Sequence, residues 1–190
     1  MKTISDGNFV LIYLFSISIA TILISTNVEI IETNTAVSED SLEKSILKKQ
    51  YPINCSSSSK LDEDWSCEKL YDGKYTTWED KSLACKDGWL EFTFSKEIYL
   101  EFIVIENPED NERFFRSHLI RDINITTSDV GFTLTKELEN DNISQWIDIN
   151  ATTSYFKIDI LSAYPGEEIN EKVPFDECAI QEITFYGRDI

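Results

Sequence analysis

The residues from Leu70 to Glu79 bring a carboxylate, a glycine, a hydroxyl and an aromatic ring into one short stretch. Asp72 supplies the carboxylate, Gly73 allows the positive φ of a tight turn, and Thr77 brings a hydroxyl back toward Asp72. Hard oxygen ligands of this kind suit calcium or sodium better than zinc or copper. The alternative is an ordinary hairpin turn, because Asp-Gly is a very common turn dipeptide. The stretch alone leaves both interpretations open.

A second set of residues has the chemistry of a sugar site, which combines an aromatic platform with a few charged or amide groups. It is concentrated in the segment 107–118, with one member in the first loop. The candidate ligand-binding residues are Trp65, Arg113, Phe115, Arg116 and His118. The alternative is structural: Phe114 or Phe115 fills one end of the fold, and the two arginines only offset nearby acids. Trp78 and Trp89 are expected in the core.

The side chains that catalysis would need are scarce. The chain has one histidine and four cysteines, which leaves no obvious pair of nucleophile and base. Paired carboxylates could serve a glycosidase, but acids are so abundant that their presence carries little weight. We therefore expect no catalytic residues and no enzymatic activity.

Composition limits the partners. At 190 residues and 42% hydrophobic content the chain has room for one ordinary domain with a real core. The formal net charge is −18, which argues against surfaces that hold phosphate groups. Nucleic acid and anionic lipid are therefore not expected as partners.

The N-terminus carries an export signal. Residues 9–25 form an uncharged apolar run of 17 residues. As a helix this run would span roughly 25 Å, short of the roughly 30 Å of a hydrocarbon core. We therefore expect residues 1–25 to be a signal peptide, with a retained signal anchor as the alternative. The mature protein would be secreted or lie at the extracellular surface.

Export agrees with two further features. An even number of cysteines in an oxidising compartment predicts two disulfides, and the spacing fits no zinc template. Four Asn-x-Ser/Thr sequons are candidate glycosylation sites: Asn54, Asn124, Asn142 and Asn150. Asn124 should face outward in a strand whose neighbours Ile123 and Ile125 face inward.

After a polar linker over residues 26–50, short β-like runs separated by turns predict one all-β domain over residues 51–190. Trp89–Phe94 and Ile98–Ile105 are expected to form an antiparallel pair, the second of them central in its sheet. The remaining predicted strands are 119–126, 132–138, 146–149, 154–161 and 179–186. Roughly eight short strands indicate an antiparallel β-sandwich.

Several stretches, taken together in their order along the chain, resemble the motifs of a known protein superfamily. They are Cys55-Ser56-Ser57-Ser58, Leu70-Tyr71-Asp72-Gly73 with Thr77-Trp78, Ile160 to Gly166, and Ala179 to Gly187. Together they resemble the discoidin, or coagulation factor 5/8 type C, superfamily of galactose-binding-like domains. The branch attached to NAD glycohydrolases is the most similar. The resemblance covers about residues 51–187 and implies an eight-stranded antiparallel jelly roll that binds ligands through loops at one end and performs no chemistry.

The resemblance also implies a structural calcium or sodium ion. Its ligands would be the side chains of Asp72, Thr77 and Glu182 with the carbonyls of Lys69, Lys74 and Gln181. If Asp72 and Glu182 meet at one ion, their loops are neighbours, and the four cysteines then pair as Cys55–Cys67 and Cys85–Cys178.

The function implied is a non-catalytic module that binds a glycan or a cell-surface glycoprotein, in recognition or adhesion. The alternative is a protein–protein interaction domain that serves as a subunit of an extracellular complex. The ligand itself is not implied, because Ser117-His118-Leu119 stand where the related branch carries an Asn-Arg pair.

Overall fold

The structure is a computed structural model that describes residues 46–190. The predicted signal segment and most of the predicted linker lie outside these residues. Within the described residues, no helix is both long and apolar enough to cross a membrane.

The described chain is mainly β-strand, and all ladders between its strands are antiparallel. The strands are β1 (Lys48–Gln50), β2 (Asn54–Ser57), β3 (Trp78–Asp80), β4 (Trp89–Glu106), β5 (Leu119–Ile120), β6 (Asp122–Thr127), β7 (Thr133–Glu137), β8 (Gln145–Ile160), β9 (Ala163–Tyr164), β10 (Cys178–Ile180) and β11 (Glu182–Asp189). The helical segments are the 3-10 turns η1 (Glu63–Trp65), η2 (Cys67–Tyr71) and η3 (Leu83–Cys85) and the helix α2 (Asn111–Arg116). β1 occupies the last residues of the predicted linker and pairs with β11.

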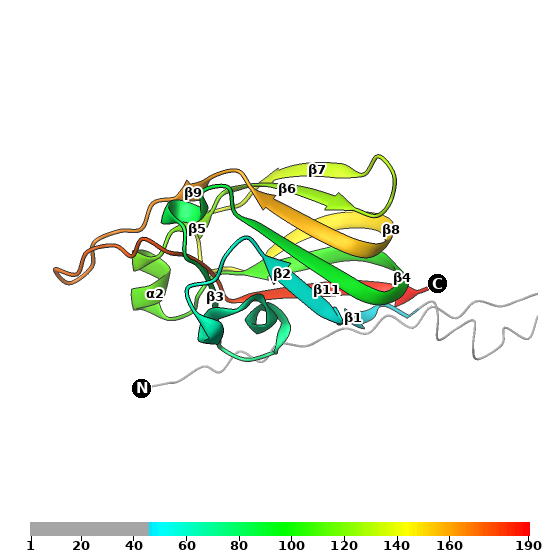
Figure 1. Cartoon of the computed structure of the whole chain (residues 1–190), viewed down its shortest axis with the longest axis horizontal. Helices are drawn as coiled ribbons and strands as arrows, with labels where there is room; N and C mark the ends of the chain where they lie inside the picture. The colour runs from blue at the N-terminus through cyan, green and yellow to red at the C-terminus, as the bar shows by residue number, and fades with distance from the viewer. Residues whose placement is uncertain (1–45) are drawn as a thin grey trace, which may run out of the picture. The chain divides into compact units, whose positions relative to one another are not determined.

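Two long strands, β4 and β8, pair with each other and belong to both layers of a sandwich (Figure 1). The first part of β4 pairs with β2, and its second part pairs with β11. The second part of β8 pairs with β6, which continues to β7. We call β1-β11-β4-β8 the β11 layer and β2-β4-β8-β6-β7 the β6 layer. The fold is thus the predicted all-β, antiparallel sandwich.

The core lies between the two layers. The Phe185 ring of the β11 layer contacts the rings of Phe92 and Phe156 in the β6 layer, at centroid distances of 5.0 and 5.4 Å. The inward rows expected from alternation are confirmed, because the residues concerned are at most 5% exposed. They are Leu90, Phe92 and Phe94 in β4 and Phe156, Ile158 and Ile160 in β8. Trp78 is also fully buried, as expected, whereas Trp89 is half-buried.

The expected antiparallel pair of Trp89–Phe94 and Ile98–Ile105 is wrong. Both segments belong to β4, and the register against β8 shifts between Thr93 and Ile98. The intervening Ser95-Lys96-Glu97 lacks the Gly, Asn or Pro that a tight reversal needs, so the extended backbone bends into the other layer and continues. In the same way 146–149 and 154–161 are parts of one strand, β8.

The loops at one end of the sandwich are tied together covalently. The structure contains both predicted disulfides, Cys55–Cys67 and Cys85–Cys178. The second disulfide links η3 to β10. The backbone of Cys178 also forms an isolated β-bridge with His118. α2, β3, β5 and β9 gather at this end, opposite the C-terminus (Figure 1). We refer to it as the loop end.

Candidate functional site

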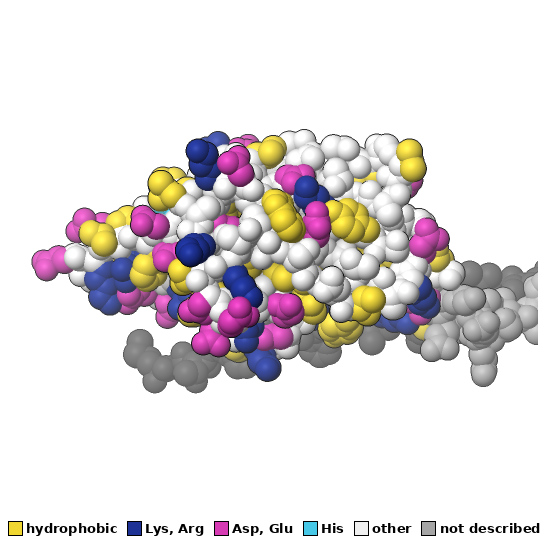
Figure 2. All heavy atoms as spheres, in the orientation of Figure 1, with side chains coloured by type: hydrophobic (Ala, Val, Ile, Leu, Met, Phe, Trp, Pro, Cys, Tyr) yellow, Lys and Arg dark blue, Asp and Glu magenta, His cyan; other side chains and the backbone are white. Residues whose placement is uncertain are grey.

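A cavity of about 570 Å³ opens at the loop end, between η1, η2 and the N-terminal part of α2. We call this cavity the loop pocket. Aromatic, basic, acidic and amide side chains border it: Trp65, Lys69, Tyr75, Glu109, Arg113 and Gln181. Its volume lies within the range of small-molecule sites. In the face drawn in Figure 2, charged side chains also concentrate toward the loop end.

Two of the predicted ligand residues, Trp65 and Arg113, meet in this pocket. The guanidinium of Arg113 lies 4.4 Å from the centre of the Trp65 ring, which is a cation–π arrangement. It also forms an ion pair with Glu79 and donates a hydrogen bond of 3.3 Å to the Thr77 hydroxyl. Burial lowers the pKa of Arg113 from its usual value, but an arginine remains charged at any physiological pH.

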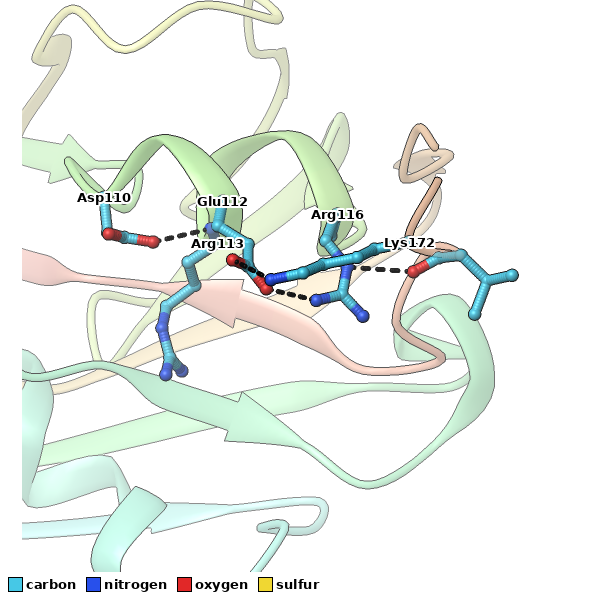
Figure 3. A network of polar contacts seen from close by, with 6 residues as sticks. Asp110, Glu112, Arg113, Arg116 and Lys172 are labelled. Atoms are coloured by element: carbon cyan, nitrogen blue, oxygen red, sulfur yellow. Dashed lines mark hydrogen bonds and ion pairs between the residues drawn. The ribbon is translucent and has the colours of Figure 1, made fainter. Parts of the chain in front are cut away.

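The helix α2 holds Arg113 in position. Its N-cap, Asp110, accepts a hydrogen bond of 2.8 Å from the Arg113 backbone N–H, as Asp does at helix starts. Figure 3 shows Arg113 extending away from Glu112, which lies between Lys172 and Arg116. Hydrogen bonds from Lys172 and Arg116 lower the pKa of Glu112. One turn of helix therefore directs the Arg113 side chain to the pocket, while Glu112 and Arg116 contact each other and Glu112 contacts Lys172.

The other three predicted ligand residues do not border the loop pocket. Arg116 lies 3.8 Å from the centre of the Phe175 ring and donates a hydrogen bond of 2.9 Å to the Val173 carbonyl. It therefore anchors the segment 165–177 to α2. Phe115 is 39% exposed and packs edge-on against Phe114. The backbone of His118 pairs with the residues on both sides of Cys178, and its Nδ1 is buried with no hydrogen-bond partner among the described residues.

The predicted ion loop has the expected backbone geometry. Gly73 has a φ of +67°, and the Asp72 carboxylate accepts hydrogen bonds from the Lys74 backbone N–H and the Thr76 hydroxyl. Asp72, Gly73 and Glu182 border one small cavity, and the charge of Asp72 contributes to the raised pKa of Glu182, so the predicted partners Asp72 and Glu182 lie close together. This closeness is what the implied ion site requires.

Glu182 has the properties of a cation ligand. Its Oε2 is buried with no hydrogen-bond partner among residues 46–190. Burial, reinforced by the nearby charges of Asp72 and Glu106, raises the pKa of Glu182 to about 7. A cation beside this oxygen would offset both effects.

The other implied ligands are less favourably placed. The Thr77 hydroxyl contacts Arg113 and Glu79, while Lys69, Thr77 and Gln181 border the loop pocket. Among the described residues no three His, Cys, Asp or Glu side chains form a group that could hold a metal ion. Asp72 and Glu182 fit a cation as a pair, and further ligands would have to be hydroxyl or backbone oxygens.

Sequence analysis did not single out several residues that shape this site, among them one ring at the pocket and the buried partner of Arg113. Tyr75 is 82% exposed and borders the pocket from the middle of the predicted ion loop. Glu79 is 6% exposed and is the buried partner of Arg113. The turn chemistry around Tyr75 could have placed that ring at the surface, but no sequence pattern marks Glu79 as buried.

The four sequons reach the surface. Asn54, Asn142 and Asn150 are exposed, and Asn124 is half-buried on the outer side of β6 between Ile123 and Ile125, which are fully buried. Their glycosylation stays a prediction.

No protein-family profile matches the sequence, and no curated protein matches it. Solved structures match its fold. One is a family 32 carbohydrate-binding module of Clostridium perfringens NanJ in complex with galactose, with 15% identity, a TM-score of 0.55 and coverage of 74% of this chain and 99% of that one. Another is the third such module from a family 31 glycoside hydrolase of C. perfringens, with 22% identity, a TM-score of 0.53 and coverage of 77% and 94%.

A third match is an F5/8 type C domain from Bacteroides fragilis, with 15% identity, a TM-score of 0.50 and coverage of 72% of this chain and 92% of that one. The chain therefore has the discoidin-like, F5/8 type C fold expected from its motifs. The similarity to the branch attached to NAD glycohydrolases stays a prediction.

Proposed function

We propose that this chain is a non-catalytic carbohydrate-binding module, secreted or held at an extracellular surface, whose loop pocket binds a saccharide. The observation that carries the proposal is the lining of that pocket. Two aromatic rings, the half-buried Trp65 and the exposed Tyr75, lie beside the hydrogen-bond donors of Arg113 and Lys69 and the acceptors of Glu109 and Gln181. Sugar hydroxyls need donors and acceptors together, and sugar C–H faces need aromatic rings.

The charged residues around the pocket favour a neutral saccharide as the ligand. Asp64, Glu109 and Asp110 border it, and the chain as a whole carries a formal net charge of −18. Of the basic residues at the pocket, Arg113 is already paired with Glu79. A sulfated or sialylated sugar would meet uncompensated negative charge, so neutral hexoses are the favoured class.

The solved structures of similar fold indicate which ligands should be tested first. The NanJ module was crystallised with galactose. A pair of family 32 modules from C. perfringens ZmpB, with 14% identity and a TM-score of 0.54, was crystallised with N-acetylgalactosamine. Both sugars are neutral, in agreement with the acidic rim of the loop pocket. Galactose-type sugars are therefore the proposed ligand class.

A calcium or sodium ion beside Asp72 and Glu182 is part of the same proposal. When bound, the ion would supply the direct contact that the Glu182 Oε2 atom lacks among the described residues. Its role would be structural, because it would fasten the loop that carries Tyr75 to the start of β11. The tyrosine would then be presented to the ligand in one position.

Calorimetric titration of the full chain with galactose, N-acetylgalactosamine and galactose 6-sulfate tests the proposal. We expect binding of the two neutral sugars and at least tenfold weaker binding of the sulfated one. Tyr75→Ala should weaken binding, whereas Tyr51→Ala, which removes a tyrosine that is 65% exposed and does not border the loop pocket, should not. Equal effects of the two variants would contradict the assignment of the pocket.

A further inference from the structure

Three aromatic rings cluster on the outer face of the β11 layer, at positions that normally face water. Phe102 of β4 contacts Trp146 of β8 and Tyr186 of β11, at centroid distances of 4.9 and 4.8 Å. The Trp146 and Tyr186 rings are nearly parallel, with 14° between their planes and 6.3 Å between their centres. Trp146 is 61% exposed, so this aromatic cluster presents ring surface to solvent.

Trp146 and Tyr186 of this cluster border a second hollow of about 410 Å³, which we call the sheet groove. Polar groups surround the rings there: Lys49 lies 5.9 Å from the centre of Tyr186, and the Ser144 hydroxyl donates a hydrogen bond of 2.9 Å to Glu106. An apolar protein surface would remove water from these charged and hydroxyl groups without offering them new hydrogen bonds. A saccharide, which has polar edges and apolar faces, satisfies both kinds of neighbour.

The sheet groove adjoins the loop pocket. Tyr75, Glu109 and Gln181 border both hollows. The Glu109 backbone N–H donates a hydrogen bond of 2.9 Å to the Gln181 side chain, which joins two of the three shared residues. A ligand that leaves the loop pocket past Tyr75 therefore enters the sheet groove and reaches Trp146.

We infer that the loop pocket and the sheet groove form one extended site for a neutral linear oligosaccharide, with its end in the loop pocket and its later sugar units on Trp146 and Tyr186. This inference rests on the proposed function. The sheet groove is bordered by three acids, Glu106, Glu109 and Glu182, and by two lysines, Lys49 and Lys74, so it has no excess of positive charge that would favour an anionic polysaccharide. The occupant is an extended chain because it would have to contact Trp65 in the loop pocket and Trp146 in the sheet groove, which are two separate hollows.

The test compares galactose with tri-N-acetyllactosamine, a neutral hexasaccharide that ends in galactose, by calorimetry on the full chain. We expect the hexasaccharide to bind at least tenfold more tightly than galactose. Trp146→Ala should remove that gain and leave galactose binding unchanged. Leu161→Ala, which truncates an exposed side chain that borders neither hollow, should change neither affinity.

The outcomes separate the two proposals. If galactose binds and the hexasaccharide binds no more tightly, the extended site is wrong and the loop pocket stands. If the gain with length persists in both Trp146→Ala and Tyr186→Ala, the later sugar units lie elsewhere and the inference is overturned. If neither sugar binds, both proposals fail. Loss of binding to a protein partner in Trp146→Ala would then assign the aromatic cluster to a protein interface.

Discussion

The guanidinium of Arg113 lies 4.4 Å from the centre of the Trp65 ring, although one residue belongs to α2 and the other to η1. The buried carboxylate of Glu79 holds Arg113 in this stack by pairing with the same guanidinium. An arginine in such a position has little freedom to reorient, so its remaining N–H groups are directed before a ligand arrives.

Arg113→Lys should weaken galactose binding by at least about tenfold, because lysine lacks the planar fork that stacks on Trp65 and pairs with Glu79. Arg113→Ala should also lower the free energy of unfolding by about 1–3 kcal/mol, since it leaves the Glu79 carboxylate buried without its donor. Calorimetric titration and urea unfolding measure the two effects. The double variant Glu79→Gln/Arg113→Ala should recover part of the stability, and an additive loss would contradict the pairing.

Calcium should stabilise the chain through Asp72 and Glu182. A ligand at a thousand times its dissociation constant adds about 4 kcal/mol to the free energy of unfolding. We expect millimolar calcium to raise the melting temperature of the native chain, and chelator to lower it. Glu182→Gln and Asp72→Asn should abolish the response, while Glu97→Gln, an exposed acid in the bend of β4, serves as the control. An unchanged response in Glu182→Gln would exclude Glu182 as a ligand.

In chelator, stability should depend on pH through Glu182. The folded state raises the pKa of this carboxyl from the ordinary 4.5 to about 7, so the folded state binds the proton more tightly than the unfolded state. The contribution is fully present below about pH 4.5 and is lost as the pH rises to about 7. Native chain should therefore lose stability over this range relative to Glu182→Gln. Parallel pH curves for the two proteins would show that another group is responsible.

The two disulfides should contribute unequally. Cys85–Cys178 closes a loop with a sequence separation of 93, and Cys55–Cys67 one of 12. Loop-closure entropy then predicts contributions of about 4.6 and about 2.8 kcal/mol. Urea unfolding of the Cys85→Ser/Cys178→Ser and Cys55→Ser/Cys67→Ser variants checks the order. A larger loss on removal of the short bridge would mean that native contacts, and not chain entropy, dominate.

Alternation in the sequence was enough to predict the inward rows of the core. Phe156, Ile158 and Ile160 face inward as expected, because a half-buried strand has a period of two. The continuity of β4 was not predicted, because a bend at Ser95–Glu97 leaves the same local pattern as a short turn. The layer to which a strand belongs depends on partners far away in the chain, and these are not visible locally.

The binding residues were also predicted only in part. Trp65 and Arg113 were expected from residue type, and the structure brings them together. Arg116 has the same chemistry as Arg113 but stacks on Phe175, because the two side chains leave one helical turn in different directions. Tyr186 was not among the predicted binding residues, and its neighbours Phe102 and Trp146 come from strands whose register only the structure gives.

The most direct test of the loop pocket uses the four tryptophan indole N–H signals of the ¹⁵N-labelled full chain during titration with galactose. Trp65 borders the pocket, whereas Trp78 is fully buried and donates to the Ser59 carbonyl. We expect the Trp65 signal to shift with a saturable dependence on galactose while the Trp78 and Trp89 signals stay in place. Saturable binding of galactose that leaves the Trp65 signal unmoved, or no binding at all, would contradict the proposed site.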